Sequence, residues 1–159
     1  MLIAVDDNLP KDRLLKRILL IGYLEELYGD RLFPTGSRWF GNATKHSDWD
    51  YFTDDNSKAI ELVNAGFKES DYWYDSNTLF VFRHESGVDL QICHNLNRRR
   101  LIQFILKSAN MVPSPSSKWS MDVWNRVYKL MEQEDINDTV AAASFALELP
   151  QRFGYTYGI

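Results

Sequence analysis

Leucine and isoleucine residues recur every three or four positions between 10 and 28, which predicts an amphipathic helix over this stretch. Pro10 suits the opening turn of this helix, and Gly29 with Asp30 ends it. The basic residues lie opposite the apolar stripe, so we expect them on a solvated helix face rather than in a nucleic-acid patch. The stripe comprises Leu14, Leu15, Ile18, Leu19, Ile21 and Leu27, and the basic residues are Lys11, Arg13, Lys16 and Arg17.

Between 32 and 93 the pattern changes to short apolar runs with a period of two, which is typical of strands. Pro34 cannot donate to a sheet ladder, so we expect the first strand to be short or to lie at an edge. A short helix closed by Gly66 is expected at 57–64. The aromatic residues at 72–74 are expected to pack in the sheet, with stacking on a base as the alternative. Strands are expected at 32–36, 48–53, 72–74, 78–84 and 88–93, and turns at 54–56, 75–77 and 85–87.

The last third of the chain shows helical periodicity on both sides of a loop. A helix through Arg98–Lys107 is expected to be capped by Asn95 or Asn97, with Leu101, Ile102, Phe104, Ile105 and Leu106 packing inward. A loop at 110–118, which acts as a lid or as a connector, precedes amphipathic helices at 119–133 and 138–149, and Pro150 is expected to stop the last helix. The predicted fold class is α/β (α+β), with a small mixed sheet flanked by helices. We expect a single domain over 1–159, with a sheet core at 1–93 and a helical part at 94–159.

Composition limits the classes of function. The 159 residues are 45% hydrophobic and 14% aromatic, as in a globular domain. A net charge of −4 argues against long nucleic acid as a partner, because sequence-independent binding needs clustered lysine and arginine. The single cysteine, Cys93, excludes an intramolecular disulfide. With no basic leader and no apolar run of about 20 residues, we expect a cytoplasmic protein without a membrane segment.

The stretch from 35 to 52 carries the candidate chemistry. Gly36 can adopt a positive φ, and Ser37 can cap the short helical turn at 37–41, whose free N–H groups suit a phosphate. Strand alternation places Asp48 and Asp50 on one face, where they can share a divalent cation. A further carboxylate is expected from Asp89, which alternates with apolar residues in a later strand.

The spacing of Gly36-Ser37-Arg38, Gly41, Ser47-Asp48-x-Asp50 and the later Asp89 resembles the signature of the DNA polymerase β nucleotidyltransferase superfamily, in its minimal (MNT-like) branch. The resemblance implies that NMP passes from an NTP to an acceptor hydroxyl, with release of pyrophosphate. It also implies Mg²⁺ or Mn²⁺ at Asp48, Asp50 and Asp89. Gly36, Ser37 and Arg38 would bind the triphosphate of the donor. Relatives modify proteins, RNA ends, antibiotics and other small molecules, so the acceptor stays open, a protein among the candidates.

Other interpretations of the same residues remain. The fold could serve a non-catalytic, antitoxin-like module that binds a partner protein, or the three acids could serve a metal-dependent phosphodiesterase or nuclease. A Gly-Ser turn followed by an acidic, solvent-exposed hairpin is the structural alternative. Asp54 and Asp55 are expected in a turn and helix cap rather than as ligands, and His46 and His94 in structural roles. Arg98, Arg99 and Arg100 fit either an anion contact or surface solubility.

Overall fold

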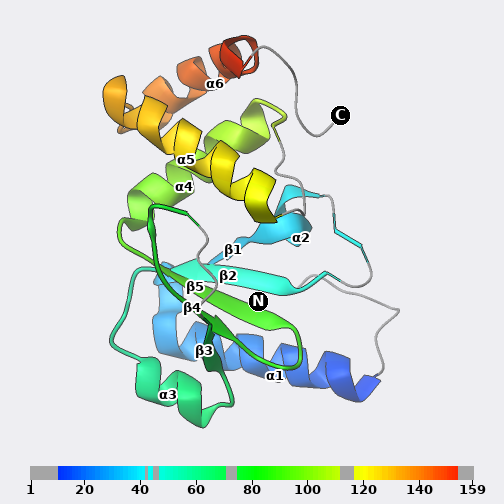
Figure 1. Ribbon diagram of the computed structural model, residues 1–159. Coiled ribbons are helices and arrows are strands. Elements are labelled where there is room, and N and C mark those ends of the chain that lie inside the picture. The colour runs from blue at the N-terminus through cyan, green and yellow to red at the C-terminus, as the bar shows by residue number, and fades with distance from the viewer. Residues whose placement is uncertain (1–10, 42, 45–46, 71–74, 112–116, 154–159) are drawn as a thin grey trace. The chain divides into compact units, whose positions relative to one another are not determined.

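The computed structural model describes residues 11–41, 43–44, 47–70, 75–111 and 117–153, with side chains from 122 onward in the last range (Figure 1). The chain divides into two compact units, Met1–Trp73 with Thr78–His94, and Tyr74–Asn77 with Asn95–Ile159. The fold is α/β, with a mixed five-stranded sheet flanked by helices and three C-terminal helices, as the sequence predicted. The elements are α1 (Lys11–Tyr28), η1 (Gly29–Arg31), β1 (Phe33–Thr35), α2 (Gly36–Phe40), β2 (Trp49–Thr53), α3 (Ala59–Asn64), β3 (Lys68–Ser70), β4 (Thr78–Arg83), β5 (Val88–Cys93), α4 (Leu96–Ser108), α5 (Ser117–Gln133) and α6 (Thr139–Phe153).

The sheet has the strand order β1-β2-β5-β4-β3. β2 and β5 run parallel, and the other neighbouring strands pair antiparallel. Pro34 lies in β1, a three-residue strand at the sheet edge, and this confirms the expected short edge strand. Strands β2, β4 and β5 lie within the predicted ranges. β3 was not expected, and the strand expected at 72–74 falls outside the described residues.

One face of the sheet carries the apolar core of the first unit, and α1 runs along it (Figure 1). The buried stripe of α1 consists of Arg17, Ile21, Leu24 and Tyr28. The sequence analysis placed the stripe partly wrongly, because Leu15 and Leu19 are 55% and 64% exposed. The buried positions 17, 21, 24 and 28 are three or four residues apart, as on one face of a helix, and Arg17 occupies the first of them. This face does not include Leu15 or Leu19. Trp49, Tyr51, Val88, Leu90 and Ile92 supply the sheet side of this core.

The second unit is built by α4, α5 and α6. Asn95 caps α4, since its side chain accepts a hydrogen bond from the backbone N–H of Arg98 at 3.0 Å. The buried residues Trp124, Val127, Tyr128 and Met131 form the expected inner face of α5. The four apolar α4 residues Leu101, Ile102, Ile105 and Leu106 are buried as predicted, whereas Phe104 is 37% exposed.

Pro150 does not stop the last helix, which continues to Phe153. A proline in a helix removes one hydrogen bond to the preceding turn, and here it lies in the final turn of α6. Leu149 and Phe153 are both buried on either side of it, and the Phe153 ring lies 4.1 Å from the guanidinium carbon of Arg126. Packing of these side chains outweighs the missing hydrogen bond.

Within the described residues, no helix combines the length and the apolar character that crossing a bilayer requires.

Candidate metal centre

Three aspartates from two neighbouring strands converge on one point. Asp48 directly precedes β2, Asp50 lies in β2 and Asp89 lies in β5. Asp50 and Asp89 are register partners in the parallel pair. One carboxylate oxygen from each aspartate lies within 4.8 Å of those of the other two. The structure therefore brings together the three acids that the sequence singled out, on the sheet face opposite the α1 core.

Burial increases across this triad from Asp48, which is exposed, through Asp50 to Asp89, which is 6% exposed. The pKa of the Asp89 carboxyl is raised to about 8, first by burial and then by the negative charges of Asp50 and Asp48. Arg83 acts in the opposite direction, with its Nε 3.8 Å from Asp89 Oδ2. The crowded carboxylates repel one another, and a divalent cation between them would relieve that repulsion.

The donor set fits a hard cation. Carboxylate oxygens alone, without cysteine or histidine, suit Mg²⁺ or Mn²⁺. The exposed Asp48 leaves one side of the cluster open, as a metal that also binds substrate oxygens requires. The three aspartates could thus hold a metal ion, and their spacing is compatible with oxygen ligands shared between ions.

The glycine turn lies directly against the triad. Gly36 has a φ of +74°, and a Cβ at this position would stand 2.2 Å from Asp50 Oδ2. Thr35, the residue before it, is the register partner of Asp50. Glycine is therefore required here both by the backbone conformation and by the approach of the carboxylate.

Ser37 lies in α2, but it is not the N-cap that the sequence analysis predicted. Thr35 takes that position, because its backbone remains extended at the end of β1 and the helical turn begins immediately at Gly36. The backbone carbonyl of Ser37 accepts a hydrogen bond from the N–H of Gly41 at 2.9 Å. The phosphate-binding roles of Gly36, Ser37 and Arg38 stay predictions.

Arg38 reaches from α2 to the segment that leads into Asp48. Its Nη2 donates to the Ser47 carbonyl oxygen at 2.8 Å, and its guanidinium carbon lies 5.7 Å from the centre of the Trp49 ring. Arg38 thereby bonds the backbone before Asp48 and lies over the side chain of the residue after it.

Sequence reasoning missed two residues beside the triad, Arg17 and Gly87. Arg17 was expected on a solvated helix face, yet it is 2% exposed, and its Nε donates to the Ser86 carbonyl at 2.5 Å. Gly87 was assigned only to a hairpin turn, yet a Cβ there would stand 3.2 Å from Asp48 Oδ1. The spacing of Arg17 from Ile21 and Leu24 was the signal that could have revealed its burial.

Asp54 and Asp55 also have partners within the first unit. Asp55 accepts a hydrogen bond from the backbone N–H of Ser57 at 2.9 Å and so serves the turn as expected, whereas Asp54 pairs with Arg31. The helix cap expected from these acids is wrong, because α3 begins at Ala59 and its N-cap is Lys58. His46 and the aromatic residues at 72–74 fall outside the described residues.

Arg99 contradicts both roles that were considered for the arginines at the start of α4. Its side chain is fully buried, and its Nη1 lies 2.7 Å from Asp75 Oδ2. Its guanidinium carbon also lies 4.4 Å from the centre of the Trp124 ring. The Arg99 guanidinium is paired with Asp75 inside the second unit, so Arg99 is neither a surface residue nor a contact for a bound anion.

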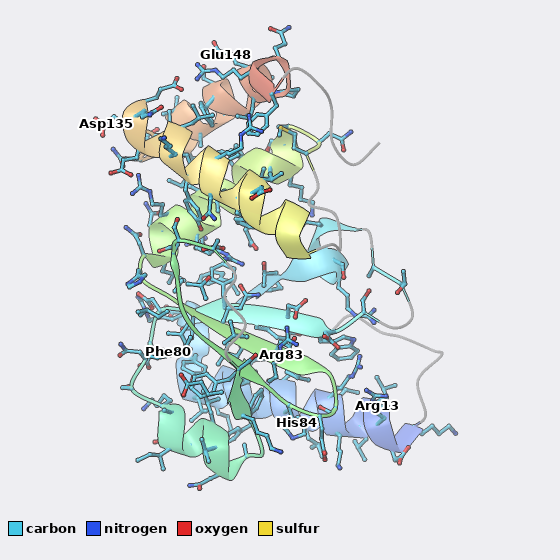
Figure 2. The ribbon with its side chains drawn as sticks, viewed as in Figure 1. Arg13, Phe80, Arg83, His84, Asp135 and Glu148 are labelled. Atoms are coloured by element: carbon cyan, nitrogen blue, oxygen red, sulfur yellow. The ribbon has the colours of Figure 1, made fainter. Side chains whose placement is uncertain are left out.

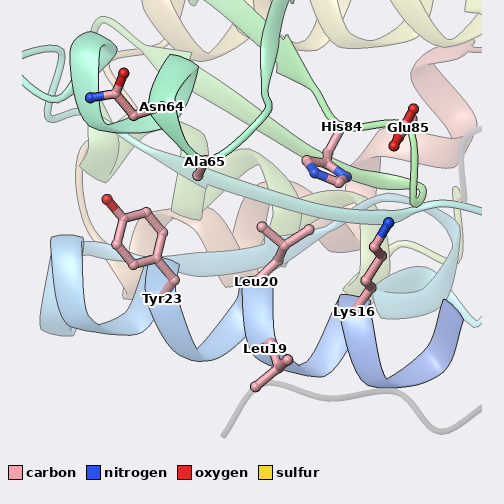
Figure 3. Close-up of a pocket in the computed structure, with 8 residues that line it drawn as sticks. All are labelled: Lys16, Leu19, Leu20, Tyr23, Asn64, Ala65, His84 and Glu85. Carbon is pink, nitrogen blue, oxygen red and sulfur yellow. The ribbon is translucent and has the colours of Figure 1, made fainter. Parts of the chain in front are cut away.

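A separate pocket of about 480 Å³ opens between α1 and the turns that follow α3 and β4 (Figure 3). None of the three triad aspartates lines it. His84 lies at its wall, where its Nδ1 accepts a hydrogen bond from the Ser86 N–H at 3.0 Å. Figure 2 shows His84 next to Arg83 at the end of β4. The lining residues are Lys16, Leu19, Leu20, Tyr23, Asn64, Ala65, His84 and Glu85.

Comparison of the chain with protein-family models, with curated proteins and with solved structures found no match.

Proposed function

We propose that this chain is a metal-dependent nucleotidyltransferase that moves NMP from an NTP to an acceptor hydroxyl and releases pyrophosphate. The observation that carries the proposal is the convergence of three aspartate oxygens within 4.8 Å, directly beside a glycine turn. The motif spacing supports it independently, since Gly36-Ser37-Arg38 and Ser47-Asp48-x-Asp50 resemble the nucleotidyltransferase signature.

Each residue has a defined part in the proposed reaction. Asp48 and Asp50 would hold the metal ions, and Asp89 would complete the second ion's ligands and orient or deprotonate the acceptor hydroxyl. The turn at Gly36 and Ser37 would receive the triphosphate. Bound Mg²⁺ would neutralise phosphate charge and align the reacting groups. The acceptor oxygen forms a bond to the α-phosphorus, the bond to the bridging oxygen of pyrophosphate breaks, and the hydroxyl proton leaves to a base.

The experiment is calorimetric titration of each NTP with Mg²⁺, because binding requires no knowledge of the acceptor. The wild type is compared with Asp48→Ala/Asp50→Ala. Asp54→Ala/Asp55→Ala is the matched control, since it removes the same charge at the other end of β2. Metal-dependent binding of one nucleotide, lost in the triad variant and kept in the control, supports the proposal and identifies the donor.

An acceptor is then sought by incubation with that NTP and mass spectrometry, in which a transferred NMP adds a defined mass. Absence of binding for all four nucleotides in a folded sample would contradict the proposal and direct work to a binding module. Cleavage of oligonucleotides without added NTP would instead favour a phosphodiesterase.

A further inference from the structure

A buried arginine lies next to the most exposed ligand of the triad. Arg17 of α1 is 2% exposed, and its guanidinium carbon lies 5.4 Å from the centre of the Trp49 ring. Its Nε donates to the Ser86 carbonyl at 2.5 Å. Arginine is seldom fully buried unless its charge serves a fixed interaction. Two anchors, a carbonyl and an aromatic face, therefore set the direction of this side chain.

The Arg17 guanidinium and the Asp48 carboxylate both lie beside Gly87. Its φ is +92°, and a Cβ there would stand 2.3 Å from Arg17 Nη2 and 3.2 Å from Asp48 Oδ1. Because Gly87 has no Cβ, the guanidinium and the carboxylate can both border the space that a Cβ would fill. The Gly87 carbonyl also accepts a hydrogen bond from the Trp49 N–H at 2.8 Å, which ties the same turn to the residue after Asp48.

Strand pairing holds the backbone of Asp48 less firmly than the backbones of Asp50 and Asp89. Asp50 and Asp89 lie inside paired strands, whereas the ladder between β2 and β5 begins at Trp49. Asp48 therefore lacks strand pairing of its own, and it is the exposed member of the triad. The Arg17 guanidinium, fixed beside the same Cβ-sized space at Gly87, electrostatically favours carboxylate orientations that turn toward it.

We propose that Arg17 is a positioning residue that acts through Asp48: the Arg17–Gly87 contact holds the Asp48 carboxylate in the orientation that binds metal. This rests on the metal centre of the proposed function. Partners that orient a metal ligand typically change metal affinity by about 10–100-fold when they are removed. A purely electrostatic effect has the opposite sign, since removal of a positive charge would tighten cation binding.

The test measures Mn²⁺ affinity by electron paramagnetic resonance, with unfolding by urea in EDTA as a check of the fold. Arg17→Met keeps the aliphatic stem and removes the guanidinium, and it is expected to weaken Mn²⁺ binding by about tenfold or more. Arg13→Met is the matched control. Arg13 lies one turn earlier on α1 (Figure 2), and its Nε donates to the same Ser86 carbonyl at 3.3 Å, but it is exposed. The control is expected to stay within about twofold of the wild type.

A double-mutant cycle with Asp48→Asn separates positioning from a general structural effect. If Arg17 acts through Asp48, Arg17→Met has no further effect on Mn²⁺ affinity in the Asp48→Asn background. An equal loss in both backgrounds overturns the proposal, and so does unchanged or tighter binding in Arg17→Met alone.

Arg17→Lys keeps the proposal testable if Arg17→Met does not fold. A lysine has one nitrogen and cannot both bond the Ser86 carbonyl and lie beside Gly87, so binding about threefold or more weaker is expected, and wild-type affinity would refute the role. If Asp48→Asn itself leaves Mn²⁺ binding unchanged, the metal centre fails and this inference fails with it. If Asp48→Asn weakens binding while Arg17→Met does not, only the inference about Arg17 is lost.

Discussion

The Gly36 backbone lies directly against the Asp50 carboxylate, and a Cβ on Gly36 would stand 2.2 Å from Asp50 Oδ2. Thr35, just before this glycine, pairs with Asp50 across β1 and β2. The turn proposed for phosphate binding is therefore packed directly against the acid proposed for metal binding. Any group larger than hydrogen on Gly36 must displace the carboxylate.

Gly36→Ala is expected to lower both stability and metal affinity. The positive φ costs about 1–2 kcal/mol for any L-residue, and the overlap with Asp50 adds about 1–3 kcal/mol. Gly41→Ala is the matched control, because Gly41 has a φ of +92° and nothing within 4 Å of its added Cβ. Urea unfolding and Mn²⁺ titration check the difference. Equal losses in the two variants would contradict the close packing of Gly36 on Asp50.

The metal-free protein is expected to lose stability as pH rises from about 4 to about 8. Asp89 has a raised pKa of about 8 in the folded state against 3.8 ordinarily, because burial and the other two acids disfavour its charge. Between these values the unfolded chain releases the proton and the folded chain keeps it, so unfolding becomes easier.

Asp89→Asn removes this dependence and serves as the comparison. Relative to the wild type in EDTA, its free energy of unfolding is expected to rise by about 2 kcal/mol or more between pH 5 and pH 8. Urea titrations at several pH values measure the difference. Parallel pH profiles for the two proteins would show that Asp89 titrates normally.

Saturating Mn²⁺ is expected to stabilise the wild type, since the three acids meet only in the folded state. At a metal concentration about 100 times Kd the gain is about 2.7 kcal/mol. Asp48→Ala/Asp50→Ala is expected to show no shift in the thermal midpoint, and excess EDTA is expected to reverse the shift in the wild type. A shift of equal size in the double variant would place the metal elsewhere.

The buried pair of Asp75 and Arg99 is expected to be essential to the second unit. Loss of one partner from a buried pair leaves an uncompensated charge, so Asp75→Asn is expected to cost about 3–5 kcal/mol. The matched control is Asp54→Asn, which breaks the more exposed pair with Arg31 and is expected to cost less than about 1 kcal/mol. Chemical denaturation measures both, and similar costs would contradict the difference in burial.

The features that the sequence predicted well are those that depend on local patterns. Period-two alternation located β2 and β5, and glycine and proline marked the turn at Gly36 and the edge strand at Pro34. The prediction of the three-aspartate cluster followed from the strand assignments, because strand alternation selects the sheet face on which each acid lies. The parallel register of Asp50 with Asp89 completed the cluster, and the sequence offered no direct signal for that register.

The failures concern charged residues whose partners come from elsewhere in the chain. Arg17 and Arg99 were both assigned to solvent or ligand, because a basic residue on a helix is usually exposed. Their burial depends on the turn at Ser86 and on Asp75, which lie 69 and 24 positions away. The prediction that Pro150 ends the last helix was wrong for a related reason. Side-chain packing at the end of α6 outweighs the local tendency of proline to end a helix.

Residues 75–77 belong to the second compact unit, although they precede β4 of the first unit. Among them, Asp75 neutralises Arg99, which lies beyond β5 in the sequence. A chimaera joined at His94 would therefore contain α4, α5 and α6 without Asp75, and the buried Arg99 would lack its counter-ion. Any chimaera that keeps α4, α5 and α6 with their buried ion pair must therefore also carry Asp75 from between β3 and β4.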